Sequence, residues 1–548
     1  MDMKAALSLL LSVISSDVAE SQHSVLHVPE PEDSIPGTPV PLVERDRVAE
    51  LTERADKKVL SESDAEAVLA RSFSEQKKWL ILGAYFLTTL SSTFNGSVYT
   101  NGVKGMQKDF HMGQQAGLVG SSVYLLADAF GSQMWAPWSE ELGRRVVIQV
   151  SLAASNLAQL PCALAPNYAT VIIGRFFAGV FQASGSVAFG AVADMWGEDD
   201  QAYAVAFIVL AYVGGSAIGP IFGPFVEAYT SWRWVFWVQL ILGGVAQALH
   251  YFCIPETRST IILDREAKRR RKELGEDVWG PNEVKAVRIS RRELITICVR
   301  PFEMFLLEPI VLCCSLLAGF GCALGYTFIQ SFTLVYKQWG FEAPKTALTF
   351  IPLLIGYIVA WASYAIPIER QKRMRLKAPD KVTPESRLWW VLYVLPLMPV
   401  GLFGFAWTSF GPSKSPWIAP MIFSVLVGMA NYAICMGVID YLTAAYGPFA
   451  SSAAGSVAFS EDALAAASTI LTSDLSTVYE RLGYEWASTL LAILALILIV
   501  PMYAFYFKGS QIRAKSRFAQ SLIKEGRRPN SSDEDTADGC KEKENDIP

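Results

Sequence analysis

Apolar residues in this chain gather into long continuous runs that are separated by polar segments. Twelve runs are about 20 residues long, which is the length that a helix needs to cross a bilayer. They lie at about 79–98, 115–135, 147–165, 169–190, 203–225, 234–254, 305–332, 345–366, 388–408, 416–437, 446–471 and 486–507. Because apolar residues do not alternate with polar ones, the runs favour spanning helices over a β-barrel. The pattern predicts an all-α polytopic membrane protein with twelve transmembrane helices.

Composition supports this prediction, since 52% of the 548 residues are hydrophobic and only 18% are charged. A soluble chain of this length would carry more charge on its surface. Most cysteines lie within or at the ends of the runs, where cysteine acts as a small apolar residue, and neither cysteine nor histidine shows metal-ligand spacing. No phosphate-binding loop of the Gly-x-x-x-x-Gly-Lys-Ser/Thr type occurs. We therefore expect no metal site, no cofactor and no enzymatic or ATP-driven activity.

Basic residues predict the orientation of the chain. They concentrate between runs 6 and 7, between runs 8 and 9, and after run 12, whereas the alternate loops carry only scattered cations. The positive-inside rule then places both termini in the cytosol. We expect the basic central loop to contact anionic lipid rather than nucleic acid. The plasma membrane is the expected location, with a vacuolar or vesicular membrane as the alternative.

The same pattern divides the chain into five parts. They are a disordered cytosolic tail (1–75), a first six-helix half (76–254), a basic cytosolic loop (255–304), a second six-helix half (305–507) and a cytosolic C-terminal tail (508–548). The apolar start, Met1 to about Ser16, could alternatively be read as a signal peptide. Cleavage and translocation there would conflict with the orientation that the other loops predict.

Three segments within and beside the runs carry distinctive residues. After run 2, Glu140, Gly143, Arg144 and Arg145 place a carboxylate, a turn glycine and paired arginines directly behind a span. Run 4 contains Gly174-Arg175-Phe176-Phe177-Ala178-Gly179, with an arginine inside the membrane, where a charge is costly and normally faces a cavity or a partner. In run 5, Gly215, Gly219 and Gly223 recur every four residues and so line one helix face, while Pro220 and Pro224 favour a kink.

Further matches lie at the flanks of the runs: Ser231–Trp237, Pro255–Arg258, Arg300–Met304, Glu308–Ile310 and Lys508–Ala514. Together with the three segments above, they resemble the major facilitator superfamily of secondary transporters, and within it the fungal twelve-span drug:proton antiporters, which include multidrug, polyamine and secondary-metabolite exporters. The resemblance covers about residues 75 to 520. The chain departs from the family pattern at Glu140, where Asp is usual, at Ala178, where Gln is frequent, and at Phe207, where Gly usually stands.

The resemblance implies two six-helix halves, each built from inverted three-helix repeats, that rock about a central site. It implies that Glu140, Gly143, Arg144 and Arg145 form a conformational latch between the halves on the cytosolic side, through charge pairing with a neighbouring helix end. Alternatively, the arginines only anchor the topology. Gly215, Gly219, Pro220 and Gly223 match the antiporter motif of drug exporters.

Four charged residues inside the predicted spans are candidates for proton coupling or substrate binding. Asp128 belongs to a polar stripe in run 2, formed by Ser121, Tyr124, Asp128, Ser132 and Trp135. Run 11 carries Glu461 and Asp462, and runs 2 and 11 lie side by side in the family. Two nearby carboxylates do not both ionise readily, so these acids could link protonation to conformation. Arg175 could bind an anionic substrate or stabilise a charged carboxylate.

Each of these candidates has a plainer interpretation. Asp128 could be a packing residue bonded to a serine or a tyrosine, the acids of run 11 could lie at a wet break in a shorter span, and Arg175 could extend to the membrane interface.

The remaining predictions concern the substrate and the kind of protein. Residues predicted to line the substrate cavity are Asn95, Tyr124, Phe328, Gln330, Tyr357, Trp361, Asn431 and Tyr432. Aromatic and amide groups suit a mid-sized organic molecule such as a toxin, pigment or drug. The leading hypothesis is proton-coupled export by a monomer. The alternatives are a facilitator or importer of a nutrient or polyamine, and a sensor that does not transport.

Overall fold

The computed structural model describes residues 57–182, 184–197, 200–284, 298–299, 302–377, 383–446, 450–471 and 475–513. The chain divides into two units, residues 1–58 and 59–548, and the described helices belong to the second. Most of the predicted N-terminal tail, much of the central loop and nearly all of the C-terminal tail lie outside the described residues.

The described residues form helices joined by short loops, with one isolated bridge, between Val59 and Trp279. A first set of long helices comprises α3 (Glu75–Val98), α5 (Gln114–Leu142), α6 (Arg144–Ala163), α7 (Tyr168–Val180), α8 (Ser184–Met195), α9 (Gln201–Tyr229) and α10 (Arg233–Cys253). A second set comprises α14 (Pro309–Lys337), α16 (Ile351–Ser363), α17 (Ala365–Lys377), α18 (Trp389–Val394), α19 (Leu397–Ala406), α20 (Ile418–Tyr446), α21 (Ala450–Leu471) and α23 (Tyr484–Arg513).

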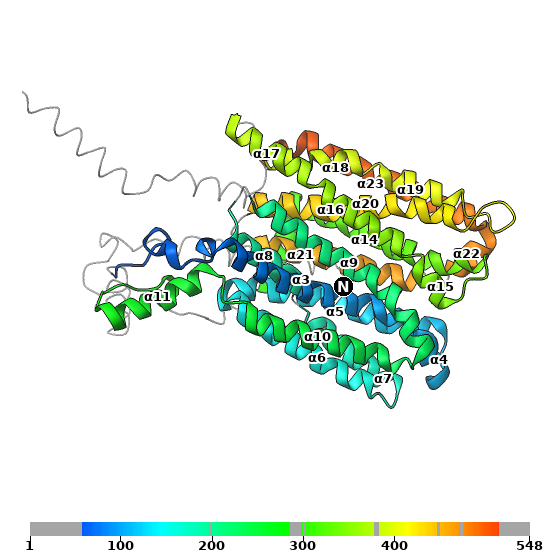
Figure 1. Cartoon of the computed structure of the whole chain (residues 1–548), viewed down its shortest axis with the longest axis horizontal. Coiled ribbons are helices and arrows are strands. Elements are labelled where there is room, and N and C mark those ends of the chain that lie inside the picture. The colour runs from blue at the N-terminus through cyan, green and yellow to red at the C-terminus, as the bar shows by residue number, and fades with distance from the viewer. Residues whose placement is uncertain are drawn as a thin grey trace, which may run out of the picture. The chain divides into compact units, whose positions relative to one another are not determined.

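Shorter elements connect or precede the long helices. They are η2 (Ser63–Val68), η3 (Ala70–Ser72), η4 (Tyr99–Gly102), α4 (Val103–Phe110), α11 (Ser259–Leu274), α12 (Pro281–Val284), α15 (Ala343–Leu348), η6 (Pro384–Leu388) and α22 (Leu475–Leu482). In Figure 1 the long helices lie side by side, and α11 extends beyond one end of them. We call this the α11 end, and the opposite end the α4 end.

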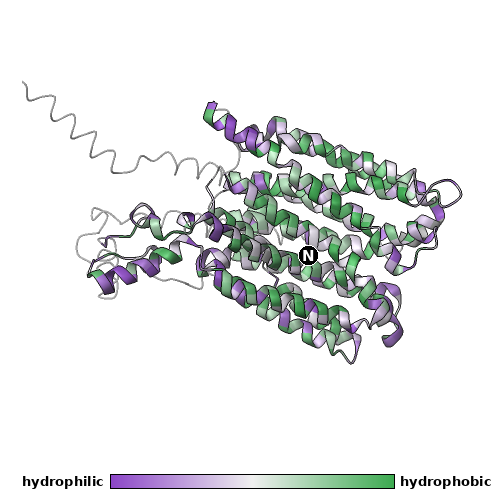
Figure 2. Cartoon of the chain, viewed as in Figure 1, coloured by the Kyte–Doolittle hydropathy of each residue, from purple (hydrophilic) through white to green (hydrophobic). Residues whose placement is uncertain are grey.

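Nine helical segments in the described part of the chain are long and apolar enough to cross a membrane. Helices α3, α5 and α21, which coincide with predicted spans 1, 2 and 11, are not among them, because serine, threonine, glycine and acidic residues dilute their apolar character. Figure 2 shows the resulting pattern, with hydrophobic residues along the bundle and hydrophilic ones on α11 and at the helix ends. A polar helix in a membrane bundle needs protein or a water-filled cavity around it.

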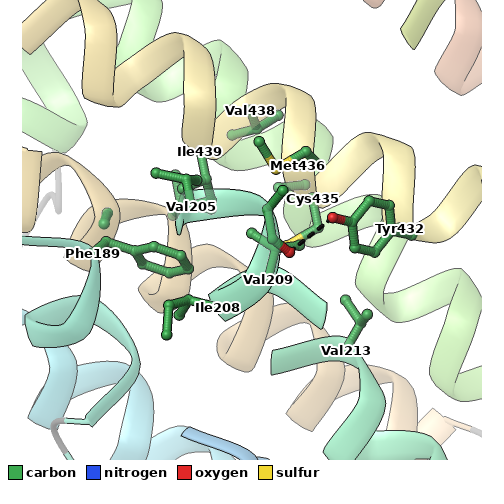
Figure 3. Close-up of a cluster of buried hydrophobic side chains, with 14 of the residues drawn as sticks. Phe189, Val205, Ile208, Val209, Val213, Tyr432, Cys435, Met436, Val438 and Ile439 are labelled. Atoms are coloured by element: carbon green, nitrogen blue, oxygen red, sulfur yellow. Dashed lines mark hydrogen bonds between the residues drawn. The ribbon is translucent and has the colours of Figure 1, made fainter. Parts of the chain in front are cut away.

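The two sets meet along a few pairs of helices. Helix α5 packs on α21, and α9 packs on both α16 and α20. In Figure 3, Val205 and Val209 of α9 face Ile439 and Met436 of α20, and Ile208 lies beside Phe189 of α8. Within this apolar contact the Tyr432 hydroxyl group donates a hydrogen bond to the carbonyl oxygen of Ala206, at 2.9 Å. The interface between the sets is therefore packed by apolar side chains along α9 and lined by polar ones along α5 and α21.

The glycines of α9 bring it close to α3, as their spacing predicts. A Cβ atom at Gly215, Gly219 or Gly223 would collide with side chains of Thr93, Ser97 and Asn101, respectively. The Ser97 hydroxyl group donates to the carbonyl oxygen of Gly215, at 3.2 Å. The stripe thus packs two helices of the same set, and Pro220, which lies inside α9, is buried there.

Residues 59–72, which composition assigns to a tail, pack against the central loop. The amide of Leu60 donates to the carbonyl oxygen of Trp279, and the guanidinium group of Arg270 donates to that of Asp64, both at 2.9 Å. Leu60 and Leu69 are buried, so apolar side chains hold this segment in place despite its polar composition. On α11, hydrogen bonds from the guanidinium groups of Arg269 and Arg270 lower the pKa of Glu266.

Candidate functional site

A cavity of about 100 Å³ lies between the two helix sets. Its lining residues come from α3, α5, α8, α9, α14, α16, α20 and α21, so both sets contribute to it. Three of the four predicted coupling residues, Asp128, Glu461 and Asp462, line this cavity.

Asp128 and Asp462 approach each other from α5 and α21 closely enough to interact electrostatically. In the part of the chain that the structure describes, neither carboxylate receives a hydrogen bond from a protein donor. The neighbouring Glu461 differs, because its carboxylate accepts a hydrogen bond from the Tyr212 hydroxyl group, at 2.8 Å. Two of the three cavity carboxylates thus have no hydrogen-bond donor in the described part of the chain, whereas the third accepts from a tyrosine of the first helix set.

Arg175 lies behind this wall rather than on it. It is fully buried, and its guanidinium group donates to the backbone and side-chain oxygens of Asn95, at 3.1 and 2.9 Å, and to the carbonyl oxygen of Gly120, at 3.4 Å. The ring of Tyr124 covers the guanidinium group, with 3.9 Å between the guanidinium carbon and the ring centroid. Burial rules out the interpretation of Arg175 as an interface arginine. Its charge still acts on Asp128.

The predicted cavity residues fall into two groups. Tyr124, Tyr357 and Asn431 line the cavity, and the Asn431 amide donates to the Tyr357 hydroxyl group, at 3.2 Å. Five others do not line it: Asn95, Phe328, Gln330, Trp361 and Tyr432.

The structure gives a reason for the position of most of these five. Asn95 binds Arg175, and Tyr432 binds the backbone of α9. Phe328 packs among aromatic rings of the second set, including Phe332 and Phe405. Trp361 packs beside Phe207 and is 36% exposed. Residue type alone therefore could not separate cavity residues from packing residues.

Several lining residues were missed by sequence reasoning. Tyr212 and Tyr326 lie in apolar runs, where tyrosine resembles an ordinary packing residue. Gln182 lies in the break between α7 and α8, which interrupts the predicted fourth span. Gln182 and Ser186 are both 5% exposed, and among the described residues the amide nitrogen of the first and the hydroxyl group of the second have no hydrogen-bond partner. Gln182 and Ser186 could have been identified from the sequence as polar residues inside an apolar run.

At the α11 end a second set of polar residues joins the helices. We call it the junction cluster; its members are Ser139, Glu140, Gly143, Arg144, Asp194, Glu256, Arg258, Ser451 and Ser452. Arg144 is 1% exposed and donates to the Asp194 carboxylate, at 2.9 Å, and to the Ser139 hydroxyl group, at 2.6 Å. It also donates to the Ser451 hydroxyl group, at 2.8 Å, across the boundary between the sets.

Two further contacts complete the junction cluster. The Ser452 hydroxyl group donates to the Glu140 carboxylate, at 3.3 Å, which again joins α21 to α5. The Glu256 carboxylate accepts from the backbone amides of Arg144 and Arg145, at 2.9 and 3.3 Å, and so caps the start of α6. Arg145 itself donates to the carbonyl oxygen of Tyr251, at 2.9 Å, within the first set.

The backbone conformation and the tight packing at position 143 require a glycine. Its φ of 101° lies in a region that side chains disfavour, and a Cβ atom would come within 2.5 Å of the Glu256 carboxylate. Sequence reasoning found Glu140, Gly143 and Arg144 but missed Asp194, the carboxylate that Arg144 binds. Asp194 lies four residues beyond the predicted end of run 4, where it looked like a loop residue.

Comparison with known proteins identifies the family. Residues 82–469 match the model of the Major Facilitator Superfamily. The transporter paaT of Penicillium rubens is 33% identical over 453 residues, which cover 82% of each chain. A citrinin biosynthesis cluster MFS transporter of Monascus ruber is 31% identical over 462 residues, which cover 82% of this chain and 90% of that one.

Solved structures agree on the fold. The proton:xylose symporter XylE aligns with a TM-score of 0.57 at 13% identity, covering 79% of this chain and 97% of that one. The human organic anion transporter MFSD10 aligns with a TM-score of 0.52 at 15% identity, covering 78% and 100%. These matches confirm the predicted all-α polytopic fold of two six-helix halves and the resemblance to fungal transporters. The chain therefore belongs to the Major Facilitator Superfamily and is a multi-pass membrane transporter.

Proposed function

We propose that this protein exports a mid-sized organic compound in exchange for protons, by alternating access, with its α11 end in the cytosol. The observation that carries the proposal is the pair Asp128 and Asp462, which face one cavity from different helix sets. Movement of α5 away from α21 would separate the two carboxylates and so change the cost of ionising both. Protonation and conformation would then depend on each other.

The junction cluster supports the alternating-access part of the proposal. Arg144 and Glu140 bond to adjacent serines of α21, and these bonds can exist only while the α11 end is closed. A proton arriving at the acids would favour one arrangement of the sets, and a substrate the other. A bistable contact of this kind is what a coupled carrier needs.

The nature of the relatives supports export of an organic compound. One relative is named for a citrinin biosynthesis cluster. Profiling of metabolites in cells and medium after deletion of the gene would identify the compound, which should accumulate inside the cells. A compound that is depleted inside the cells instead would favour an importer.

Proton coupling is tested with the purified protein in vesicles. A pH gradient should drive uptake of the identified compound, and a protonophore should abolish that uptake. Asp128→Asn should leave the folded protein in the membrane but remove the pH dependence of transport. Normal pH-dependent flux in both Asp128→Asn and the double variant Glu461→Gln/Asp462→Asn would defeat the coupling proposal.

A further inference from the structure

We infer that the cavity binds an organic cation, an amine-bearing compound that also carries a hydrogen-bond acceptor. This inference rests on the proposed function, because it names the class of compound that the same site would carry. Three features of the cavity support it: its charge, its aromatic wall, and two polar groups that have no hydrogen-bond partner among the described residues.

The charge of the cavity is negative. Asp128, Glu461 and Asp462 line it, and Arg175 is the cation whose charge acts on Asp128 from behind the wall. Three carboxylates and one guanidinium group give a formal charge of −3 + 1 = −2 when all four are ionised, and each proton that the acids hold raises this charge by one. While at least two of the three carboxylates are ionised, a positive ligand is favoured over a neutral or a negative one.

The two most open acids can reach a ligand. Asp128 and Asp462 receive no hydrogen bond from a donor in the described part of the chain, so their oxygen atoms can accept from an ammonium group. Arg175 does not line the cavity. Its guanidinium group binds Asn95 and Gly120 behind the ring of Tyr124.

The wall around the acids also suits a cation. Four tyrosines line the cavity: Tyr124, Tyr212, Tyr326 and Tyr357. Aromatic ring faces attract ammonium groups and also provide apolar area for the rest of a ligand. An amine could therefore lie on the rings while it donates to the carboxylates.

An independent observation points to the second part of the ligand. Gln182 and Ser186 line the same cavity and are both 5% exposed. In the part of the chain that the structure describes, the side-chain nitrogen of Gln182 and the hydroxyl group of Ser186 have no hydrogen-bond partner. Buried polar groups are normally paired, so unpaired ones in a cavity wall indicate the place of a ligand. The Gln182 amide is a donor, which matches an oxygen acceptor on the ligand.

Binding of matched probes to the full-length protein in detergent tests this inference. The probes are (6-methoxynaphthalen-2-yl)methylamine, the corresponding alcohol and the corresponding carboxylic acid, which differ mainly in charge. At neutral pH the amine should bind about tenfold more tightly than the alcohol, and the acid more weakly than both. Equal or tighter binding of the alcohol or the acid, or no measurable binding of the amine, would overturn the inference.

Variants assign the two contacts. Asp462→Asn should reduce the preference for the amine over the alcohol to less than about threefold, because one of the two open carboxylates is lost. Gln182→Leu should weaken binding of the methoxy-bearing amine. It should leave binding of naphthalen-2-ylmethylamine, which lacks the acceptor, unchanged. Asp109→Asn removes a carboxylate that binds Trp232 at the α4 end and should change neither preference. An unchanged preference in Asp462→Asn would contradict the inference.

Failure of this inference can be told apart from failure of the proposed function. Binding is measured without any gradient, so it does not depend on proton coupling. Flux that a protonophore does not change, together with a clear preference for the amine, would contradict proton coupling but not the substrate class. Proton-coupled flux of an acidic or neutral compound, together with no preference for the amine, would contradict the substrate class but not the proposed function.

Discussion

Two buried arginine–aspartate pairs lie at the α11 end, one in each helix set. In the first, Arg144 binds Asp194, and in the second, Arg387 of η6 binds Asp440 of α20, at 2.7 Å. Both pairs are nearly inaccessible to solvent. Arg144 is the first residue of α6 and Asp194 lies near the end of α8, whereas Arg387 lies in η6, which directly precedes α18, and Asp440 lies near the end of α20. Their surroundings differ. Arg144 also bonds to Ser451 of the opposite set, whereas Asp440 receives its bonds from Arg387 and Tyr364, both in its own set.

The difference separates two roles that one kind of contact can have. A pair whose bonds cross the boundary between the sets changes its energy when the sets separate, and so it can bias the conformation. A pair whose bonds stay within one set holds that set together in every conformation. The location of the partners decides between the roles, because breaking a buried pair is costly in either case.

The largest effect is expected from Arg144→Gln. Among the described residues, this change leaves Asp194 with Arg258, at 3.5 Å, as its one basic partner, and it removes the bond to Ser451. Breaking a buried pair costs about 3–5 kcal/mol, so flux per folded molecule should fall at least about tenfold. Flux in vesicles, corrected for the amount of protein, measures this. Arg145→Gln, which alters a contact within the first set, is the control and should keep most of the activity.

A large effect of another kind is expected from Asp440→Asn. It replaces the carboxylate that Arg387 binds by a neutral amide, so the melting temperature should fall, while the access equilibrium should stay unchanged. Access is measured by alkylation of Cys322, which lines the cavity, as the only cysteine retained, with an impermeant maleimide added from either side. A shift in labelling as large as that in Arg144→Gln would erase the proposed difference between the pairs.

Gly143→Ala tests how strictly the junction cluster depends on its turn. The positive φ and the approach to Glu256 should cost about 1–3 kcal/mol, which lowers both stability and flux. Gly197→Ala, at a glycine of the same end with open space around its Cβ position, is the matched control. Equal melting temperatures for the two variants would show that the turn is not constrained.

A moderate effect is expected from the double variant Ser451→Ala/Ser452→Ala. It removes the hydrogen bonds that reach α21 and leaves both charges of the Arg144 pair in place. At about 1 kcal/mol for each bond, access to Cys322 from the α11 side should rise about fivefold or more. Ser468→Ala, on the same helix, removes a bond within α21 and should have no effect on access. Unchanged access in the double variant would show that these bonds do not bias the conformation.

The smallest effect is expected from Asp200→Asn. Asp200 binds Lys372 across the boundary between the sets, at 2.5 Å, but its side chain is 61% exposed. Exposed pairs contribute about 0–1 kcal/mol and weaken with salt. Access to Cys322 should change by less than about threefold at low salt and not at all at high salt. A larger change that persists in salt would mean that this exposed pair also sets the conformation.

The sequence by itself determined the membrane fold and the family. Continuous apolar runs predict helices because a bilayer leaves no other partner for backbone groups. Local motifs located the turn at Gly143 and the glycine face of α9, because each depends on residues close together in the chain. The five-part division of the chain and its orientation, read from charge and hydropathy, stay predictions.

Only the tertiary structure decided which polar residues meet. Helices α5 and α21 lie more than 300 residues apart in the chain, so no local pattern fixes their relative rotation, yet that rotation brings Asp128 to Asp462. Packing between other pairs of helices places Arg175 behind Tyr124, gives Arg144 its partner Asp194, and keeps Phe328 and Trp361 out of the cavity wall. Side-chain type shows what a residue can bind, and packing between distant helices decides what it does bind.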